Sequence, residues 1–347
     1  MNIAGRTVGA GAPVYVIAEA GVNHDGSLDA ALALVDAAAD AGADAVKFQT
    51  FDPAALTVEA APLAEYQRER GEADDQRAML ERLRLPDADF AALRDHAAAR
   101  DIVFLSAPFD EHSAQLLADL DVPAFKLGSG ELTNLPFLAR VAGYGKPLIL
   151  STGMATLDEV AAAVDTVRAA GCRNLALLHC VSSYPTPIEQ ANLRAMDALR
   201  QAHPDAVIGY SDHVLGLDAA VASVARGAQV LERHLTLDRS APGPDHALSS
   251  EPDEFGELVR RVRATEAALG DGDKRPQPAE TDVREVARRS LVATRALAPG
   301  DTLDADALAA KRPGGGISPA RLDELLGRRV ARPVTAGAPM REDDLEA

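Results

Sequence analysis

Short apolar runs alternate, along the first 270 residues, with Ala-rich segments in which apolar positions recur every three or four residues. The short runs predict β-strands and the longer periodic segments predict helices. The predicted strands span 14–20, 45–51, 102–109, 124–130, 147–152, 175–182, 207–213 and 230–237. The predicted helices lie near 27–42, 87–100, 111–120, 134–143, 156–170, 192–202, 216–227 and 253–269.

The predicted strands are too apolar for one of their faces to meet water, which is typical of a parallel sheet covered by helices. Eight strand-then-helix units in about 270 residues predict an α/β fold of the TIM-barrel type, (β/α)8. A doubly wound open sheet is the alternative, but no GxGxxG follows the first strand. Two polar insertions, 52–86 and 238–252, follow the second and eighth strands.

The composition changes at 271–285, a charged and Pro-rich stretch that is typical of a linker. We therefore expect a barrel domain at 1–272, a linker at 273–285 and a separate C-terminal domain at 286–347. The last segment has short strand-like pieces, many Gly and Pro, and one candidate helix at 319–326. A domain of about 60 residues is marginally stable alone, so we expect it to dock on a partner surface.

The formal net charge of −18 argues against a nucleic-acid partner, because a polyanion would be repelled over most of the surface. No apolar run reaches the roughly 18 residues that a membrane span needs, and the first residues do not resemble a secretory signal. The two Cys cannot build a disulfide framework. These features predict a soluble, cytoplasmic protein with no membrane partner.

Polar residues interrupt the apolar strands, nearly all in the second half of each strand. A buried polar group without a partner costs several kcal/mol, so these positions need a reason. The carboxyl ends of barrel strands meet at one rim, where barrel enzymes build their active sites. The polar residues in or just after the strands are Glu19, Lys47, Gln49, Ser106, Lys126, Ser129, Glu131, Ser151, His179, Ser182, Tyr184, Ser211, His213, Glu232 and His234.

Two pairs of these residues suggest specific chemistry. His213 and His234 lie on neighbouring strands and could share one divalent metal, although a single strand His is more often a hydrogen-bonded core residue. Lys47 and Lys126 are cations inside the barrel, and Gly-rich turns lead into helices beside them. Helix N-termini together with a Lys can form a phosphate site. A lysine here could also form a buried ion pair with a nearby carboxylate such as Glu19, and the two roles do not exclude each other.

Collinear motifs over nearly the whole chain resemble the sialic acid synthase family. In the barrel these are VIAEAGVNHDGS (16–27), VKFQTF (46–51), FLSAPFD (104–110), FKLGSGELTNLP (125–136), GKPLILSTGM (145–154), LLHCVSSYPTP (177–187), IGYSDHVLG (208–216) and ERHLTLDRSAPGPDHALS (232–249). RRSLVA (288–293) and KRPGGGIS (311–318) resemble the antifreeze-like (SAF) domain of that family. The resemblance implies a TIM barrel followed by this small domain.

The resemblance also implies a reaction: phosphoenolpyruvate condenses with a 2-acetamido-2-deoxyhexose to give a nine-carbon 2-keto sugar acid and phosphate. N-acetylmannosamine or a 2,4-diacetamido analogue would be the sugar. A divalent ion, Mn²⁺ ahead of Mg²⁺ or Co²⁺, would polarise the sugar aldehyde. In a domain-swapped homodimer, the C-terminal domain of one subunit would complete the site of the other.

The implied roles fall on residues that match the family motifs. The metal ligands would be His213 and His234. Phosphoenolpyruvate would be held by Lys47, Gln49, Lys126, Ser129, Ser151, Ser182 and Ser211. Glu19 and Glu131, with the two lysines, would act in catalysis. Tyr184, Asp245 and Arg312 would bind the sugar, with Arg312 reaching its acyl group from the other subunit.

Two positions depart from the family pattern. Ala107 replaces a Thr that many of these synthases carry, so one phosphate hydrogen bond is lost or passes to Ser106. Ser182 stands where sialate-making members usually carry Asn. Both changes bear on specificity more than on the class of reaction. They leave open whether N-acetylmannosamine itself is the substrate.

Other functions are compatible with parts of this pattern. Another phosphoenolpyruvate-dependent 2-keto-3-deoxy sugar acid synthase would share the barrel but not the C-terminal domain. A Schiff-base aldolase would use Lys126 and leave the two His idle. A non-catalytic carbohydrate-binding or ice-binding module would need a disrupted rim, whereas these rim residues are mostly intact.

Overall fold

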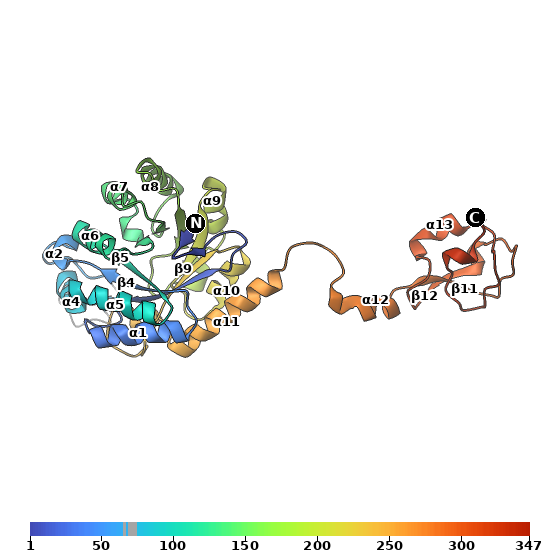
Figure 1. Ribbon diagram of the computed structural model, residues 1–347, viewed down its shortest axis with the longest axis horizontal. Coiled ribbons are helices and arrows are strands. Elements are labelled where there is room, and N and C mark those ends of the chain that lie inside the picture. The colour runs from blue at the N-terminus through green and yellow to red at the C-terminus, as the bar shows by residue number, and fades with distance from the viewer. Residues whose placement is uncertain (65–66, 69–74) are drawn as a thin grey trace. The chain divides into compact units, whose positions relative to one another are not determined.

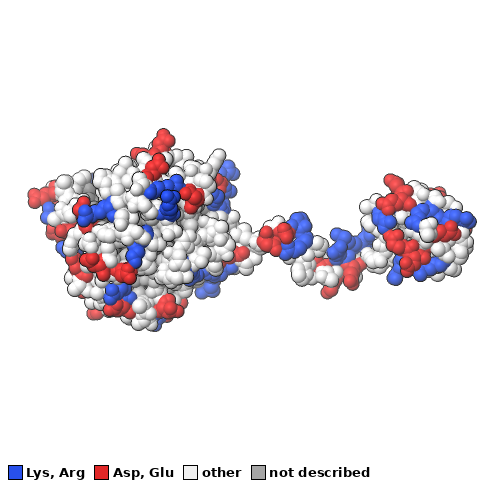
Figure 2. All heavy atoms as spheres, turned by 45° about the horizontal axis from the view of Figure 1, so that its top comes forward, with Lys and Arg blue, Asp and Glu red and all other residues white. Residues whose placement is uncertain are grey.

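The computed structural model describes residues 1–64, 67–68 and 75–347. The chain divides into two compact units, Met1–Gly270 and Asp271–Ala347, and each is described by itself. Within the described residues, no helix combines the length and the apolarity needed to cross a membrane. Acidic and basic side chains are interspersed with uncharged surface on the visible face of the first unit (Figure 2).

The first unit is built on an eight-stranded parallel sheet in the order β5-β4-β3-β10-β9-β8-β7-β6. The end strands β5 and β6 lie side by side, so the sheet curls into a nearly closed barrel. The strands are β3 (Tyr15–Gly21), β4 (Ala45–Thr50), β5 (Val103–Pro108), β6 (Phe125–Leu127), β7 (Leu148–Ser151), β8 (Leu175–Cys180), β9 (Val207–Asp212) and β10 (Val230–His234). The predicted barrel fold is therefore confirmed.

Helices surround this sheet on its outside (Figure 1). Those at the predicted positions are α1 (Leu28–Asp40), α5 (Asp87–Ala99), α6 (Glu111–Asp119), α7 (Leu135–Ala142), α8 (Leu157–Ala169), α9 (Ala195–Ala202), α10 (Asp218–Ala225) and α11 (Pro252–Leu269). The first polar insertion adds α2 (Pro53–Leu56) and α4 (Gln76–Leu83). A large apolar cluster between strands and helices forms the main core.

The interior of the barrel is apolar near the amino ends of the strands and polar near their carboxyl ends. Alternate residues of a strand share a face, so Val230, Glu232 and His234 point to the same side of β10. Val230 belongs to an apolar cluster inside the barrel, as Ala45 of β4 does, and Lys47 follows two residues later. The amino-terminal part of the interior is thus closed by apolar side chains, and only the carboxyl-terminal part is polar.

The intervening residue of β10 faces the other way and fixes the register of two site strands. Arg233 pairs with Asp212 of β9 in the ladder, and its Nη1 lies 2.5 Å from Asp212 Oδ2. Its Nε donates to Ser250 Oγ over 3.1 Å. Both charged side chains are almost completely buried, with side-chain exposures of 1% and 0%. This outward-facing ion pair holds β9 and β10 so that Ser211, His213, Glu232 and His234 face the interior.

The second unit is a small, mostly irregular domain. Its antiparallel strands β11 (Ser290–Ala293) and β12 (Leu308–Lys311) and the short helix α13 (Leu322–Leu325) surround an apolar cluster of their own. Part of the predicted linker is helical: α12 spans Thr281–Ala287, after a 3-10 turn at Pro278–Glu280. Pro278 at the first helical position and the Gln277–Glu280 capping box explain why this charged segment begins a helix.

We expect Arg233→Met to lower the free energy of unfolding by about 3–5 kcal/mol, because it leaves the Asp212 carboxylate buried without its counter-charge. Urea unfolding followed by circular dichroism measures this loss. Arg260→Met is the matched control, since the Arg260 side chain is 70% exposed. Equal stability of the two variants would contradict a structural role for the buried pair.

Candidate active site

A cavity of about 470 Å³ opens at the carboxyl ends of the strands. This volume lies in the range of small-molecule sites. The cavity gathers most of the predicted site residues in one place: Glu19, Lys47, Gln49, Lys126, Ser129, Ser151, Ser182, Tyr184, Ser211, His213, His234 and Asp245.

Two buried lysines and two buried glutamates form an ion network on the cavity floor. Lys47 Nζ lies 2.6 Å from Glu19 Oε2 and 3.8 Å from Glu232 Oε2. Lys126 Nζ lies 3.4 Å from Glu232 Oε1, which also accepts a hydrogen bond from Ser211 Oγ over 3.0 Å. Glu232 therefore connects the two ammonium groups.

Burial and mutual charge set the pKa of each group in this network. Burial raises the pKa of Glu19 to about 7, although Lys47 acts in the opposite direction. Burial also lowers the pKa of Lys126. For Glu232, burial favours the neutral acid, but the Lys126 and Lys47 ammonium groups outweigh it and hold its pKa below the usual range. Glu232 is thus the dependable counter-charge for both lysines near neutral pH.

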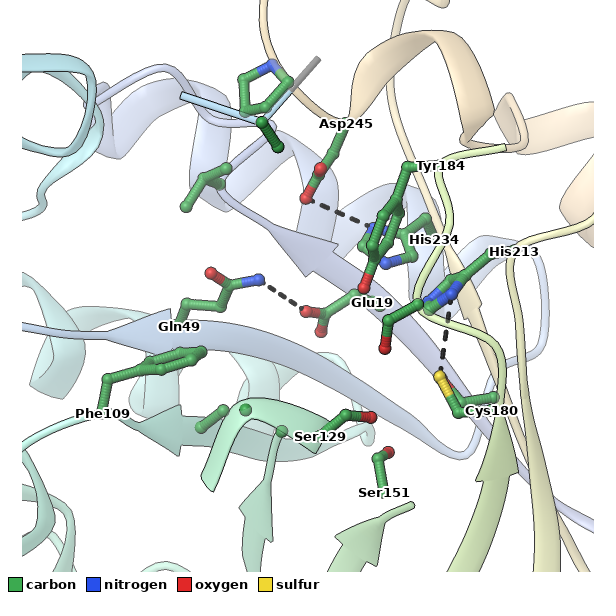
Figure 3. A pocket seen from close by; sticks show the side chains of 18 of the residues that line it. Glu19, Gln49, Phe109, Ser129, Ser151, Cys180, Tyr184, His213, His234 and Asp245 are labelled. Atoms are coloured by element: carbon green, nitrogen blue, oxygen red, sulfur yellow. Dashed lines mark hydrogen bonds and ion pairs between the residues drawn. The ribbon is translucent and has the colours of Figure 1, made fainter. Parts of the chain in front are cut away.

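Hydroxyl and amide groups lie beside the network. Ser151 Oγ and Ser182 Oγ are buried and have no hydrogen-bond partner among the residues that the structure describes. Ser129 Oγ accepts a hydrogen bond from the Gly153 amide over 2.9 Å, and Gln49 Nε2 donates to Glu19 Oε1 over 3.1 Å (Figure 3). Buried polar atoms without partners are rare in folded proteins, so the two serine hydroxyls point to a polar ligand.

The two histidines lie next to each other on one side of the cavity (Figure 3), with ring centroids 5.3 Å apart. His213 Nδ1 lies 2.8 Å from the carbonyl oxygen of Val181. Donation of Nδ1–H to this carbonyl would leave Nε2 as the ligand atom, the usual arrangement of a metal-binding histidine. His234 Nδ1 is buried without a hydrogen bond and lies 3.7 Å from Asp245 Oδ2. Burial holds the pKa of His234 far below its usual value, so this imidazole is neutral.

Burial alone would lower the pKa of His213, but the neighbouring Cys180 raises it to about 8, so this imidazole would release a proton when an ion binds. With that proton released, these features suit a divalent metal held by the two imidazoles. The described residues contain no group of three His, Cys, Asp or Glu side chains placed to enclose an ion. His213 and His234 would therefore supply only part of a coordination shell, and substrate or water oxygens would complete it.

Some predicted residues lie elsewhere. Glu131 does not line the cavity; it is buried next to it, where its Oε2 accepts a hydrogen bond from Asn134 over 2.9 Å. Arg312 is exposed on the second unit, in the loop after β12. Ala107 does line the cavity, whereas Ser106 is fully buried and hydrogen-bonded to Thr50 Oγ1 at 2.6 Å. Ser106 is thus already engaged within the barrel wall.

The cavity also contains residues to which the sequence pattern assigned no role. Glu232 stood among the polar strand residues, and its position two residues before His234 was the signal that it shares the same face. Cys180 lines the cavity with its Sγ 3.7 Å from His213 Nδ1. Three apolar residues of α4, Met79, Leu80 and Leu83, form one side of the cavity. Nothing in the sequence of the polar insertion indicated that it folds back to the rim.

Comparison with known proteins covers both units. The NeuB family model matches residues 34–274, and the SAF domain model matches residues 288–346. N,N'-diacetyllegionaminic acid synthase of Legionella pneumophila is 41% identical over 338 residues, which cover 96% of this chain and 95% of the relative. Mouse N-acetylneuraminate-9-phosphate synthase is 35% identical, with coverage of 99% and 96%.

A solved structure gives the same result. The spore coat polysaccharide biosynthesis protein SpsE of Bacillus subtilis superposes with a TM-score of 0.70 at 37% identity. The match covers 100% of this chain and 99% of that one. The resemblance seen in the strand-end motifs is therefore confirmed over the whole length, and the chain belongs to the NeuB family, with a SAF domain after its barrel.

Proposed function

We propose that this protein condenses phosphoenolpyruvate with a 2-acetamido-2-deoxyhexose, either N-acetylmannosamine or a 2,4-diacetamido analogue, to a nine-carbon 2-keto sugar acid. The observation that carries the proposal is a cavity that brings together two lysines, two serine hydroxyls without a partner among the described residues, and two neighbouring imidazoles. The names of relatives support the sugar class, since they include legionaminic, pseudaminic and N-acetylneuraminate-9-phosphate synthases.

Phosphoenolpyruvate is an anion with a phosphate and a carboxylate, and the cavity floor offers matching groups. Lys47 and Lys126 supply the positive charge, and Ser129, Ser151, Ser182 and Ser211 supply hydroxyl groups. Binding here satisfies the buried Ser151 and Ser182 hydroxyls, which otherwise lack partners. Gln49 lies next to these lysines and serines, where its side chain donates a hydrogen bond to Glu19.

The sugar aldehyde is placed by the His213–His234 side of the cavity, with Tyr184 and Asp245 next to it. The C3 carbon of phosphoenolpyruvate attacks the aldehyde carbon, a C–C bond forms, and the aldehyde oxygen takes up a proton. Water then adds at C2 and gives up a proton, which leaves a hydroxyl there. The bond from C2 to the phosphate oxygen breaks, the hydroxyl loses its proton and becomes the keto group, and phosphate leaves. Glu19, with a pKa of about 7, is suited to hold or release a proton in this sequence.

His213 and His234 would hold a divalent ion, for which Mn²⁺ is our first choice and Mg²⁺ or Co²⁺ are alternatives. When bound, such an ion supplies Lewis-acid polarisation of the aldehyde oxygen. Burial lowers the pKa of His234 and keeps this imidazole neutral, and the Val181 carbonyl orients the His213 ring, which would release its proton on binding.

The second unit enters the proposal through Arg312. Its guanidinium is exposed and would bind the acyl group of the sugar in a second copy of the chain, within a domain-swapped homodimer. We also propose a cytoplasmic location, which the free thiols of Cys172 and Cys180 support, since a reducing compartment keeps thiols unpaired.

Phosphate release from phosphoenolpyruvate, dependent on an added 2-acetamido sugar, is the direct test of this function. We expect turnover to be lost after exhaustive chelation and restored by Mn²⁺, and His234→Ala to lower kcat about a thousandfold or more. Far-ultraviolet circular dichroism checks that the variant remains folded. Chelator-insensitive turnover would remove the metal from the proposal, and borohydride trapping of pyruvate on Lys126 would replace it with Schiff-base chemistry.

Glu232→Gln tests the ion network separately. Without the carboxylate, Lys126 loses the charge that most strongly opposes its desolvation, so its pKa falls further. We expect the KM for phosphoenolpyruvate to rise about tenfold at pH 7, since one charge-assisted contact is weakened. The increase should grow as the pH is raised, because Lys126 then loses its proton. Exposed Glu189→Gln is the control, and an unchanged KM between pH 6.5 and 8.5 would contradict the role of Glu232.

Subunit complementation tests the swapped dimer. Lys126→Met disables the barrel of one chain, and Arg312→Ala removes the arginine of the other. If each barrel uses the partner's arginine, mixed dimers contain one intact site, and refolding equal amounts should recover about a quarter of wild-type activity. No recovery beyond the sum of the separate variants would mean that the domain acts within its own chain or only as a support.

A further inference from the structure

His234 has one buried ring nitrogen that lacks a hydrogen bond. Its Nδ1 has no hydrogen-bond partner among the described residues, although the ring borders the cavity. Because Nδ1 is shielded, Nε2 is the ring atom left for a ligand. A neutral imidazole carries one proton, so Nε2 can bind an ion only when that proton is on Nδ1. The Nδ1–H then needs an acceptor within the protein.

A carboxylate lies beside this nitrogen. Asp245 Oδ2 is 3.7 Å from His234 Nδ1 (Figure 3), and the two side chains are 11% and 7% exposed. An approach of roughly 0.8 Å would bring the two atoms to the usual N–H···O separation of about 2.9 Å. Hydrogen bonds in active sites are often long before ligands bind and shorten in the complex. Asp245 is therefore suited to accept the Nδ1–H of His234.

His213 has the same arrangement with a different acceptor. Its Nδ1 lies 2.8 Å from the carbonyl oxygen of Val181. Metal-binding histidines usually donate their second N–H to a carbonyl or a carboxylate, which fixes the tautomer and the orientation of the ring. Val181 directly follows β8, whereas Asp245 lies in the long loop between β10 and α11. The position of that loop therefore decides whether His234 has its acceptor.

The backbone of Asp245 is held by the turn that follows β3. Ser249 Oγ donates to the carbonyl oxygen of Asp245 over 2.6 Å, and Asn23 Nδ2 donates to Ser249 Oγ over 2.9 Å. Asn23 Nδ2 also donates to the carbonyl oxygen of Leu235 over 2.9 Å. Asn23 and Ser249 are 4% and 0% exposed. Buried hydrogen bonds thus join both ends of the loop to the rim of the barrel.

The next residue, His246, anchors the same loop a second time. Its Nδ1 lies 2.7 Å from Thr236 Oγ1, and its Nε2 lies 3.2 Å from Asp25 Oδ2. The His246 side chain is 4% exposed. Gly243 packs against the ring so closely that a Cβ there would lie 2.8 Å from His246 Cδ2. The loop is therefore closed around His246, one residue away from Asp245.

We propose that Asp245 is a positioning residue for the metal site: it accepts the Nδ1–H of His234 and so directs Nε2 of that ring to the divalent ion. His246, fixed between Thr236 and Asp25, keeps the Asp245 carboxylate in this place. The inference rests on the metal of the proposed function. It gives Asp245 a task that does not depend on which sugar is bound.

Mn²⁺ binding in the absence of substrates tests the role of Asp245, by calorimetry or from the electron paramagnetic resonance signal of free Mn²⁺. Asp245→Ala should raise the Kd for Mn²⁺ about 10- to 100-fold, the usual effect of removing the partner of a metal-binding histidine. Asp245→Asn should recover part of this loss, because its amide oxygen still accepts a hydrogen bond. Asp238→Ala is the matched control and should leave the Kd unchanged, since Asp238 is exposed on the same loop and does not line the cavity.

A double-mutant cycle tests the role of His246. His246→Ala alone should raise the Kd for Mn²⁺ about three- to tenfold, and it should have little further effect in Asp245→Ala, because both changes act through one carboxylate. His96→Ala is the control, since His96 also pairs with an aspartate, Asp36, but between α5 and α1. Circular dichroism checks folding. If His246→Ala does not fold, Asp25→Asn replaces it in the cycle, because the Asp25 side chain is 49% exposed.

The outcomes separate this inference from the function on which it rests. An unchanged Kd in Asp245→Ala, with a higher KM for the sugar, keeps the function and overturns the inference, because Asp245 then acts only on the sugar. Weaker Mn²⁺ binding by that variant supports the inference even if the wild type releases no phosphate with any 2-acetamido sugar, a result that rejects the proposed reaction. Fully additive effects of His246→Ala and Asp245→Ala would overturn the part assigned to His246. Wild-type protein that binds no Mn²⁺ would overturn both the inference and the metal of the proposed function.

Discussion

The position of Glu232 between Lys47 and Lys126 is the interaction on which the site depends. Two ammonium groups buried at 3% side-chain exposure would otherwise repel each other and lose their protons. Burial acts against the charge of both lysines, and Glu232 opposes this effect at both, while Glu19 opposes it most strongly at Lys47. The protonation of Glu19 changes near neutral pH, because burial raises its pKa to about 7. The lysines of the cavity floor can therefore still attract an anion, although each already has a carboxylate partner.

An ion pair on the outer face of β9 and β10 fixes the strands that carry Glu232 and the histidines. Arg233 lies between Glu232 and His234 in sequence and faces outward, where it is fixed by Asp212, while Asp212 precedes His213. A slip of one residue would turn all of the inward-facing groups to the wrong face. The outward ion pair and the inward site thus share one register. This arrangement explains why a fully buried Arg–Asp pair occurs in an otherwise apolar layer.

The periodicity of the sequence sufficed for the barrel, because each buried parallel strand is an apolar run and each helix has its own apolar stripe. It also sufficed to bring Lys47, Lys126, His213 and His234 to one rim, since strand parity and strand direction are local properties. It could not place Glu131, whose side chain is turned to Asn134 by a 3-10 turn after β6. It could not place α4 either, because the fold of an insertion depends on contacts that are distant in sequence.

Residues at the strand ends and residues of the polar insertion form different parts of the cavity. The lysines and glutamates of the ion network lie on strands of the barrel, and the two histidines lie at or directly after the ends of β10 and β9. The apolar wall of the cavity comes from α4, which packs on the rim through a cluster separate from the main core. The strands and their ends thus position the ion network and the histidines through the main core, whereas the apolar side of the cavity depends on packing that the main core does not share.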